Sequence, residues 1–502
     1  MRVLYITSEV FPFAKTGGLA DVSASLPVAL RELGIDIRLL VPGYRQALDR
    51  ARNLKEVVRL GDPLNCGQVR LLEAHLPHTD VPVWFVDCPA LYDRDGGLYQ
   101  SEDGAEWADN ALRFALLNHV AAGIANEPGR AWRPDLMHCN DWHAGLVPLL
   151  LAGRETPRPK TLFTIHNLAY QGLVAAEEIA NLDLPPNAFA AMEFYGRASF
   201  LKAGIFMADA VTTVSPTYAS EILTEEYGCG LHGLLREKAG YLTGILNGVD
   251  YRIWDPSTDP HIACNYSQRS FAAKAKCKEA LQTELGLEVD AKTPLMAFMS
   301  RLVHQKMPDV VLEALPAFIE RGMQFVLVAE GDDGYETGFR EFAARYPRQV
   351  AVQIGYEEAL GHRVLAGADM LLHPARFEPC GLVPIYAMRY GALPLVRESG
   401  GMADTVVDAS PDAIRQGTAT GFSFQSPSAE ELIGCVDRAL SLFHQPIAWR
   451  RLQAAAMRQD FSWERSADAY AELYRSLTGR PSGETSEEPS TAPASRLTKL
   501  TA

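Results

Sequence analysis

Short apolar runs alternate with amphipathic stretches along most of the chain, a pattern typical of repeated strand and helix units. In the first half these runs end at glycine, proline or polar clusters. They predict strands at 3–6, 37–41, 83–86, 136–138, 162–165, 211–214 and 242–246. The helical periodicity between them predicts helices that include 19–33, 105–125 and 145–151.

The alternation is interrupted after Asn247, where a Pro- and Asp-rich stretch at 254–260 predicts a linker. The second series has predicted strands at 295–299, 325–328, 350–353, 370–373, 393–396 and 422–424, with helices such as 308–320, 382–389 and 429–442. The fold class expected is therefore α/β, with two parallel-sheet domains. Their facing strand ends predict a deep interdomain cleft that binds the ligand.

The composition narrows the class of protein. The 502 residues are 47% hydrophobic, which is enough to bury a large core. No run of about 18 or more uncharged apolar residues occurs, so no segment is predicted to cross a bilayer as a helix. A formal net charge of −15 opposes binding to nucleic acid or anionic membranes, whereas a neutral polysaccharide meets no such repulsion. The eight cysteines are scattered without a Cys-x-x-Cys pair, which favours a reducing cytoplasm.

The two ends of the chain differ in character. The amino terminus, MRVLYITSEVFPF, enters an apolar run at once and places Glu9 where a secretory signal would continue its hydrophobic region. This segment is interpreted as the first strand of the fold. From Pro481 the chain is rich in Ser, Thr, Pro and Glu, so a disordered tail is expected at 481–502.

The segment Lys15-Thr-Gly-Gly-Leu-Ala-Asp follows the first predicted strand and opens the first predicted helix. Gly17 and Gly18 let backbone amides approach a ligand, the amino end of a helix favours negative charge, and Lys15 adds a cation. These features predict an anion site. The alternative is an ordinary strand-to-helix turn with a surface lysine, because short glycine motifs also match by chance.

Two histidine-containing motifs stand at predicted strand ends. His138-Cys-Asn-Asp-Trp-His143 suggests zinc, but the spacing is not a usual ligand pattern and no second ligand pair follows, so no metal is predicted. Asp141 is instead expected to contact sugar hydroxyls. In Thr164-Ile-His-Asn-Leu-Ala-Tyr-Gln-Gly, His166 is either a substrate contact or a hydrogen-bonded core histidine.

Two charged motifs follow strands of the second half. Arg301 and Lys306 are expected to clamp a diphosphate leaving group, with the Gly381 amide as a further donor. Glu378 is expected to hold sugar hydroxyls. The competing interpretation is that these Arg and Lys side chains are ordinary solvated surface charges.

Together these segments resemble the bacterial glycogen synthase and plant starch synthase family, whose hallmark is KTGGLADV. The similarity runs from about residue 1 to about 478, through KTGGLADV, NDWHAGL, TIHNLAYQG, ILNGVD, SRLVHQK, GYEE, RFEPCGL and FSWERSA. It implies a GT-B fold and transfer of glucose from ADP-glucose to the non-reducing end of glycogen or another α-1,4-glucan, with retention of configuration. It also implies that no metal or other cofactor is needed. The oligomeric state is left open.

The resemblance also assigns domains and residues. It implies a Rossmann-like acceptor domain at 1–248, a Rossmann-like donor domain at 249–460 and a closing helix at 461–480 around Trp463. The implied catalytic residues are Lys15, His166, Arg301, Lys306 and Glu378. The implied substrate-binding residues are Gly17, Gly18, Asp21, Asp141, Asn247, Tyr356, Cys380, Gly381 and Leu382.

The implied roles divide the site in three. Lys15 and Gly18 would meet the donor phosphates, and Arg301 and Lys306 would stabilise the departing ADP. The residues expected near the nucleoside are Asp21, Asn247 and Tyr356, and those expected around the transferred glucose are Asp141, His166 and Glu378.

Three departures from the family pattern lie beside these residues. Met307-Pro308 follows Lys306 where the family usually has glycine, Val383-Pro384 replaces the usual Thr-Gln, and Glu330-Gly-Asp-Asp replaces a more glycine-rich turn. Valine lacks the hydroxyl that threonine offers to a phosphate. The alternatives are therefore a related transferase with another donor or acceptor, and a catalytically weak paralogue that binds glucan or nucleotide.

Overall fold

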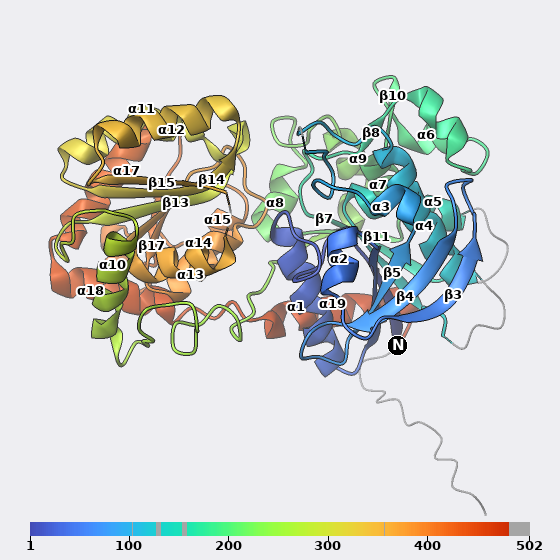
Figure 1. Ribbon diagram of the computed structural model, residues 1–502, viewed down its shortest axis with the longest axis horizontal. Coiled ribbons are helices and arrows are strands. Elements are labelled where there is room, and N and C mark those ends of the chain that lie inside the picture. Colours follow the sequence, from blue (N-terminus) through green and yellow to red (C-terminus); the bar gives the residue numbers. More distant parts are fainter. Residues whose placement is uncertain (103, 127–131, 153–157, 356, 481–502) are drawn as a thin grey trace, which may run out of the picture.

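The computed structural model describes residues 1–102, 104–126, 132–152, 158–355 and 357–480. The predicted tail and Tyr356 lie outside these residues. Two α/β domains lie side by side, the first coloured blue to green and the second yellow to orange in Figure 1. Each domain has its own sheet and its own hydrophobic core. No helix in the described residues is both long and apolar enough to cross a membrane.

The amino-terminal domain is built on a nine-stranded sheet in the order β12-β11-β7-β6-β1-β2-β5-β4-β3. Its strands are β1 (Arg2–Ile6), β2 (Asp36–Pro42), β3 (Lys55–Gly61), β4 (Val69–His75), β5 (Pro82–Asp87), β6 (Leu136–Asn140), β7 (Lys160–Ile165), β11 (Ala210–Thr213) and β12 (Leu242–Gly244). A small second sheet contains β8 (Leu173–Val174), β9 (Glu193–Phe194) and β10 (Arg197–Ser199).

Helices cover the large sheet because its central strands are buried on both faces, as Val3 to Ile6 illustrate. The helices of this domain are α1 (Gly18–Glu32), α2 (Arg45–Arg50), α3 (Pro89–Tyr92), α4 (Asn110–Asn126), α5 (Leu146–Ala152), α6 (Ala188–Met192), α7 (Phe200–Met207), α8 (Pro216–Glu221) and α9 (His232–Glu237). Helix α4 begins at Asn110 instead of 105, because the preceding segment forms a turn closed by a bridge between Gln100 and Glu106.

The pattern analysis did not predict strands β3 and β4. They pair antiparallel with each other, and β4 also pairs antiparallel with β5, so this edge departs from the parallel arrangement of the rest of the sheet. Most residues of β3 are exposed, so the strand lacks the regular apolar alternation that marks a half-buried strand.

The carboxy-terminal domain has a six-stranded parallel sheet in the order β15-β14-β13-β16-β17-β18. Its strands are β13 (Leu295–Leu302), β14 (Gln324–Gly331), β15 (Val350–Ile354), β16 (Met370–His373), β17 (Leu393–Arg397) and β18 (Phe422–Phe424). Its helices are α10 (Lys274–Glu284), α11 (Pro308–Glu320), α12 (Asp333–Arg345), α13 (Glu358–Gly367), α14 (Leu382–Arg389), α15 (Gly401–Thr405), α16 (Pro411–Gln416), α17 (Ala429–Phe443) and α18 (Pro446–Met457).

Strand order determines where a ligand meets each sheet. Counted along the chain, the strands of the second sheet lie in the order 3-2-1-4-5-6, which is that of dinucleotide-binding domains. The parallel strands of the first sheet, β5-β2-β1-β6-β7-β11, follow the same order. In such sheets the ligand binds where the order reverses, which is after β1 and β6 in one domain and after β13 and β16 in the other.

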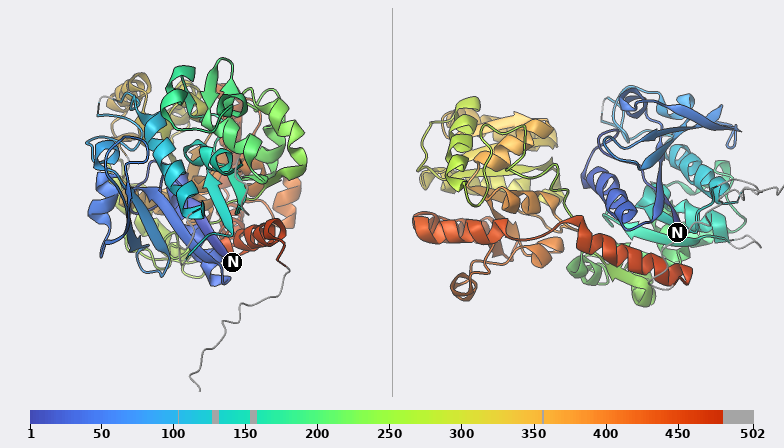
Figure 2. Two further views of the ribbon diagram at one scale, coloured as in Figure 1. Left: turned by 90° about the vertical axis from the view of Figure 1, so that its right-hand side faces the viewer. Right: turned by 90° about the horizontal axis from the view of Figure 1, so that it is seen from below.

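The last helix, α19 (Trp463–Thr478), returns to the amino-terminal domain, as the view from below in Figure 2 shows. Trp463, Tyr470 and Tyr474 are buried in the core of that domain. The chain crosses between domains a second time here, and Val249 N donates to Phe461 O at 2.7 Å where the two crossings meet. The two domains are therefore joined by a double connection.

Candidate active site

Lys15 lies in the loop between β1 and α1. Its ammonium is 2.9 Å from Asp21 Oδ1 on α1 and 2.9 Å from Glu358 Oε2 at the start of α13, in the other domain. Burial lowers the pKa of Lys15, but the two carboxylates raise it by more, so the side chain remains an ammonium. The predicted cation of the amino-terminal domain thus faces the carboxy-terminal domain.

Glu9 holds this loop in place. Its buried carboxylate accepts hydrogen bonds from Thr16 N at 2.6 Å and Gly17 N at 3.2 Å, and from the hydroxyls of Thr16 at 2.5 Å and Tyr99 at 2.6 Å. The Gly17 amide, which the sequence suggested for an anionic ligand, is therefore bonded to Glu9. An anion at this turn would therefore meet the first turn of α1 from Gly18 onwards, and would reach Lys15 only in exchange for one of its carboxylate partners.

Asp141 and His166 come together at the ends of β6 and β7. Asp141 has φ +55°, and its Oδ1 accepts a hydrogen bond from His166 N at 2.8 Å. Burial raises the pKa of Asp141 to about 7, and backbone amide donors offset part of that rise. Burial lowers the pKa of His166 to about 3, so its imidazole is neutral. Its Nε2 donates to Asn140 Oδ1 at 3.0 Å.

The other two histidines of the motifs serve the core. His138 bonds to the hydroxyl of Tyr474 at 2.6 Å and to that of Thr164 at 2.7 Å, and so ties β6 to the returning helix. His143 stacks between the rings of Trp142 and Tyr99, with ring centroids 4.0 and 4.8 Å away. Within the described residues, no group of three or more His, Cys, Asp or Glu side chains is arranged to hold a metal ion.

Lys306, Glu378 and His373 form a buried cluster at the switch point of the second sheet. Glu378 Oε2 accepts hydrogen bonds from Lys306 Nζ and from His373 Nε2, the latter at 2.9 Å. Burial alone would raise the pKa of Glu378, but Lys306 and His373 outweigh it and lower the pKa to about 2. This carboxylate is therefore ionised at neutral pH.

Arg301 lies near the end of β13, which runs three residues further than predicted, and Gln305 lies in the turn after it; both reach toward the amino-terminal domain. The exposed Arg301 guanidinium lies 5.6 Å from the centre of the Tyr170 ring. Gln305 Oε1 accepts a hydrogen bond from Asn167 Nδ2 at 3.4 Å. Tyr170 and Asn167 belong to the motif of His166. This motif of the first domain therefore contacts the Arg301 to Lys306 motif of the second domain.

The segment 380–382 packs against the first domain as well. The thiol of Cys380 interacts with Asn247, and burial raises its pKa to about 12. Gly381 precedes α14 with φ +80°, a conformation that favours glycine, and a Cβ there would lie 1.8 Å from Met402 Cε and require that side chain to move. A Cβ on Gly18 would lie 3.2 Å from Leu382 Cδ1, which brings the amino ends of α1 and α14 close together.

The departures at 307 and 383 alter the two helix starts. Met307 adopts φ +55°, a conformation that suits glycine, and its side chain is fully buried. Pro308 occupies the first turn of α11, where a missing amide costs no helical hydrogen bond. Val383 lies in the first turn of α14 and offers no hydroxyl there.

Further bonds between the domains surround the cluster. Ser215 Oγ donates to Pro379 O at 2.6 Å, and Gly400 N donates to Glu221 Oε1 at 2.8 Å. These bonds join α8 to the segments that follow β16 and β17. Among the described residues, the predicted site residues therefore gather at one interdomain interface.

The arrangement supports chemistry on a sugar diphosphate. Two cationic groups from different domains, Lys15 and Lys306, lie at switch points that in other sheets bind nucleotides. Two carboxyl groups, which can accept hydrogen bonds from hydroxyls, lie after β6 and β16: Asp141 and Glu378. The fold and the site define a two-domain glycosyltransferase of the GT-B type.

Comparison with known proteins identifies the branch of this class. The starch synthase catalytic domain family matches residues 2–237, and the family glycosyl transferases group 1 matches residues 286–451. The glycogen synthase of Burkholderia thailandensis is 52% identical over 97% of this chain and 92% of its own length. That of Paramagnetospirillum magneticum is 49% identical over 96% of this chain and 99% of its own length. The chain belongs to the starch and glycogen synthase family.

Solved structures give the same answer for the fold. The catalytic domain of starch synthase IV from Arabidopsis thaliana, bound to ADP and acarbose, superimposes with a TM-score of 0.86 at 31% identity, covering 95% of this chain and 99% of that one. Sucrose-phosphate synthase from Thermosynechococcus elongatus shares the fold alone, with a TM-score of 0.59 at 18% identity over 95% of this chain and 99% of that one.

The motif analysis missed several residues of this interface. Glu9 is an acid in an apolar run just after a predicted strand, and His373 is the last residue of a predicted strand. Both positions are typical of ligand-binding residues in parallel sheets, so the sequence could have suggested both. Glu358 lies in the GYEE motif, but its contact with Lys15 could not be predicted, because that contact depends on how the two domains meet.

Proposed function

We propose that this protein elongates an α-1,4-glucan such as glycogen, transferring glucose from ADP-glucose to the non-reducing end with retention of configuration. One observation carries the proposal. Lys15 and the cluster of Lys306 and Glu378 follow the switch-point strands of two sheets, and bonds between the domains bring those switch points together. Starch synthase IV, bound to ADP and acarbose, has the same fold over nearly the whole chain.

In this mechanism the cations act mainly on the leaving group. Negative charge grows on the diphosphate as the bond to glucose breaks, and fixed positive groups stabilise it in proportion. Arg301, Lys306 and the amino end of α14 would supply this charge from one domain and Lys15 from the other. Lys15 would then exchange Glu358 for a phosphate oxygen.

The sugar gains positive character at the same time. A neutral His166 does not repel it, and the ionised Glu378 is held ready to accept a hydroxyl of the glucose. Asp141 adds a second carboxylate once it loses its proton. Retention requires ADP to leave on the face that the acceptor hydroxyl attacks, so charge stabilisation at the diphosphate matters more than a separate base.

The proposal includes no metal, because side-chain cations and helix amino ends provide the positive charge that a phosphate needs. Treatment with EDTA should therefore leave the initial rate unchanged. A rate that falls and returns on addition of Mg²⁺ or Mn²⁺ would contradict this part of the proposal. We also place the protein in the cytoplasm, in line with eight cysteines that are all free thiols.

The decisive experiment compares donors. Purified protein is incubated with glycogen and either ADP-glucose or UDP-glucose, and ADP or UDP release and glucan elongation are measured under initial-rate conditions. Faster transfer from ADP-glucose supports the proposal. Equal or reversed rates would overturn the donor assignment, and an absence of transfer from both would favour a binding paralogue.

A further inference from the structure

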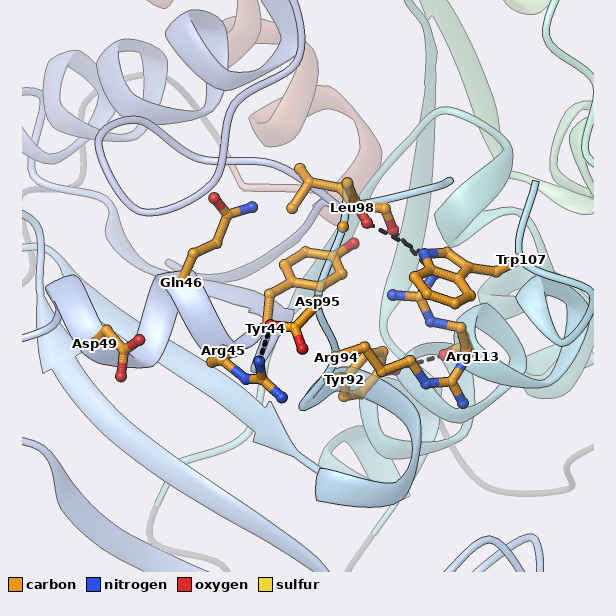
Figure 3. Close-up of a pocket in the computed structure, with 12 residues that line it drawn as sticks. Tyr44, Arg45, Gln46, Asp49, Tyr92, Arg94, Asp95, Leu98, Trp107 and Arg113 are labelled. Carbon is orange, nitrogen blue, oxygen red and sulfur yellow. Dashed lines mark hydrogen bonds and ion pairs between the residues drawn. The ribbon is translucent and has the colours of Figure 1, made fainter. Parts of the chain in front are cut away.

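A hollow in the amino-terminal domain lies apart from the proposed active site. Its volume is about 190 Å³, and Figure 3 shows Tyr44 among the side chains that line it. The arginines of its wall already have partners. Arg45 and Arg94 form ion pairs with nearby aspartates, and Arg113 donates to backbone carbonyl oxygens. These arginines therefore stabilise the fold, whereas the buried cluster of the carboxy-terminal domain faces the proposed active site.

His373 belongs to that cluster, although it lies outside the motifs that carry the family resemblance. It is the last residue of β16 and is 3% exposed. Its Nε2 lies 2.9 Å from Glu378 Oε2, and Lys306 Nζ bonds to the same oxygen. One carboxylate oxygen of the proposed active site is therefore shared by two donors that follow different strands.

The backbone around Glu378 is anchored independently of these two donors. Gly401 N donates to Glu378 O at 3.0 Å, and Gln305 Nε2 donates to Phe377 O at 3.0 Å. The main chain is therefore held in place even when a side-chain donor is lost. What the two side-chain donors determine is the direction of the carboxylate.

The protonation state of His373 follows from its surroundings. Burial lowers the pKa of His373, and the Lys306 ammonium lowers it further, so the ring is neutral at neutral pH. Glu378 is ionised and can only accept, so the hydrogen of the neutral ring is on Nε2. Nδ1 then carries no hydrogen, and it has no hydrogen-bond partner among the residues that the structure describes. His373 therefore directs its single N–H at Glu378.

This arrangement differs from that of a histidine that supports the core. His138 uses both ring nitrogens, which bond to the hydroxyls of Tyr474 and Thr164. Within the described part of the chain, His373 bonds through one nitrogen alone, and its partner is a carboxylate of the proposed active site. Because buried polar groups are as a rule fully hydrogen-bonded, a half-bonded ring indicates a purpose other than packing.

Lys306 has two competing uses for its charge. In the structure its ammonium pairs with Glu378, whereas the proposed reaction needs it at the diphosphate. When Lys306 turns toward ADP it loosens its hold on a buried carboxylate, and an unpaired buried charge is strongly destabilising. A hydrogen bond to a charged acceptor is about twice as strong as one between neutral groups. The N–H of His373 can therefore stabilise the ionised carboxylate after Lys306 has turned away.

We propose that His373 is a positioning residue, which keeps Glu378 oriented and ionised while Lys306 turns to the diphosphate of the donor. The inference rests on the proposed function, because it takes the diphosphate as the ligand that Lys306 meets. His373 touches neither the sugar nor the phosphate in this scheme. It acts through Glu378 alone.

The test compares substitutions of nearly equal size. His373→Met and His373→Leu remove the donor, whereas His373→Gln can place an amide N–H near the position of Nε2. The parent and the three variants are titrated with ADP by isothermal calorimetry, and kcat and KM are measured with ADP-glucose and glycogen. Tm is measured without ligand, so that the effect of each substitution on the fold is known.

We expect the Kd for ADP to rise on the order of 10-fold in His373→Met and His373→Leu, as the loss of one hydrogen bond to a charged group implies. The kcat should fall by a similar factor, and the KM for glycogen should stay at the parent value. In His373→Gln the Kd and kcat should return to within a few-fold of the parent values, because the donor is restored.

A lower Tm with the ADP affinity and kcat of the parent would overturn the proposal, because the ring would then serve the fold alone. A His373→Gln variant as impaired as His373→Met would also overturn it. ADP binding requires no transfer, so a parent protein that binds ADP without elongating glycogen would contradict the proposed function alone, and the Kd values would still decide the role of His373. A parent protein that binds no ADP would overturn both.

Discussion

Replacing Glu9 tests whether the Lys15 loop must be held in place for donor binding. The carboxylate receives four hydrogen bonds, two on each oxygen: the Thr16 and Gly17 amides donate to Oε2, and the Thr16 and Tyr99 hydroxyls donate to Oε1. Glu9→Ala removes all four. Glu9→Gln can keep them, because its carbonyl accepts from the amides and its NH₂ donates to hydroxyl oxygens, which also act as acceptors.

The magnitude follows from the freedom that the loop regains. Ordering the backbone of one residue costs about 1–2 kcal/mol, so releasing Thr16 and Gly17 leaves about 2–4 kcal/mol to be supplied by donor binding. Water that enters beside the exposed Thr16 recovers part of this loss. A rise in donor KM on the order of 10- to 100-fold is therefore expected for Glu9→Ala, and a change of only a few-fold for Glu9→Gln.

The assay measures kcat and KM for ADP-glucose at saturating glycogen, and KM for glycogen at saturating donor. Circular dichroism spectra of the variants check that the fold is intact. A parent-like donor KM in Glu9→Ala would refute the role of Glu9 as a positioning residue. So would a Glu9→Gln variant as impaired as Glu9→Ala, because the effect would then come from the charge and not from the hydrogen bonds.

Three further predictions follow from the site. Arg301→Ala and Lys306→Ala should each lower kcat on the order of 10²-fold. Only Lys306→Ala should also lower Tm, because it leaves the buried Glu378 carboxylate without its cation. A parent-like kcat in both variants would refute the leaving-group role. Burial raises the pKa of Asp141 to about 7, so the folded protein keeps a proton that the unfolded chain loses above about pH 4. Stability therefore falls as the pH rises from 4 to 7, and Asp141→Asn should raise Tm at pH 8 but not near pH 4. Equal shifts of Tm at both pH values would contradict this prediction. Met307→Gly should relieve about 1–2 kcal/mol of strain from the left-handed backbone conformation. It also removes a buried side chain whose packing stabilises the fold by about 2–5 kcal/mol, so Tm should fall. A rise in Tm would show that the strain is the larger effect.

Local pattern accounts for much of the fold. Every strand expected at a central position of the two sheets is present, because a strand buried on both faces needs a continuous apolar run wherever its neighbours lie. The edge strand β3 escaped prediction because it is mostly exposed, so its residues are not constrained to alternate. Its place in the sheet comes from pairing with β4, whose side chains are mainly buried.

The candidate site also has a part that local sequence suggests and a part that only the packing of the domains creates. Lys15, Asp141, His166 and Glu378 could be suggested as candidates from sequence because they lie in the loops that follow buried strands, at the ligand-binding edge of a parallel sheet. The bond between Lys15 and Glu358 could not, since it joins residues 343 positions apart and exists only through the packing of one domain on the other.

The sequence by itself therefore determined the order of the central strands and their helices, the two-domain α/β class and the polar residues near strand ends, all of which depend on neighbours in the chain. Tertiary structure alone decided which of those groups remain available. It bonded the Gly17 amide to Glu9, turned His138 toward Tyr474 and paired Lys15 with Glu358 of the other domain. The physical reason is that hydrogen bonds and ion pairs act over a few ångströms, and that proximity is created by folding between residues far apart in sequence.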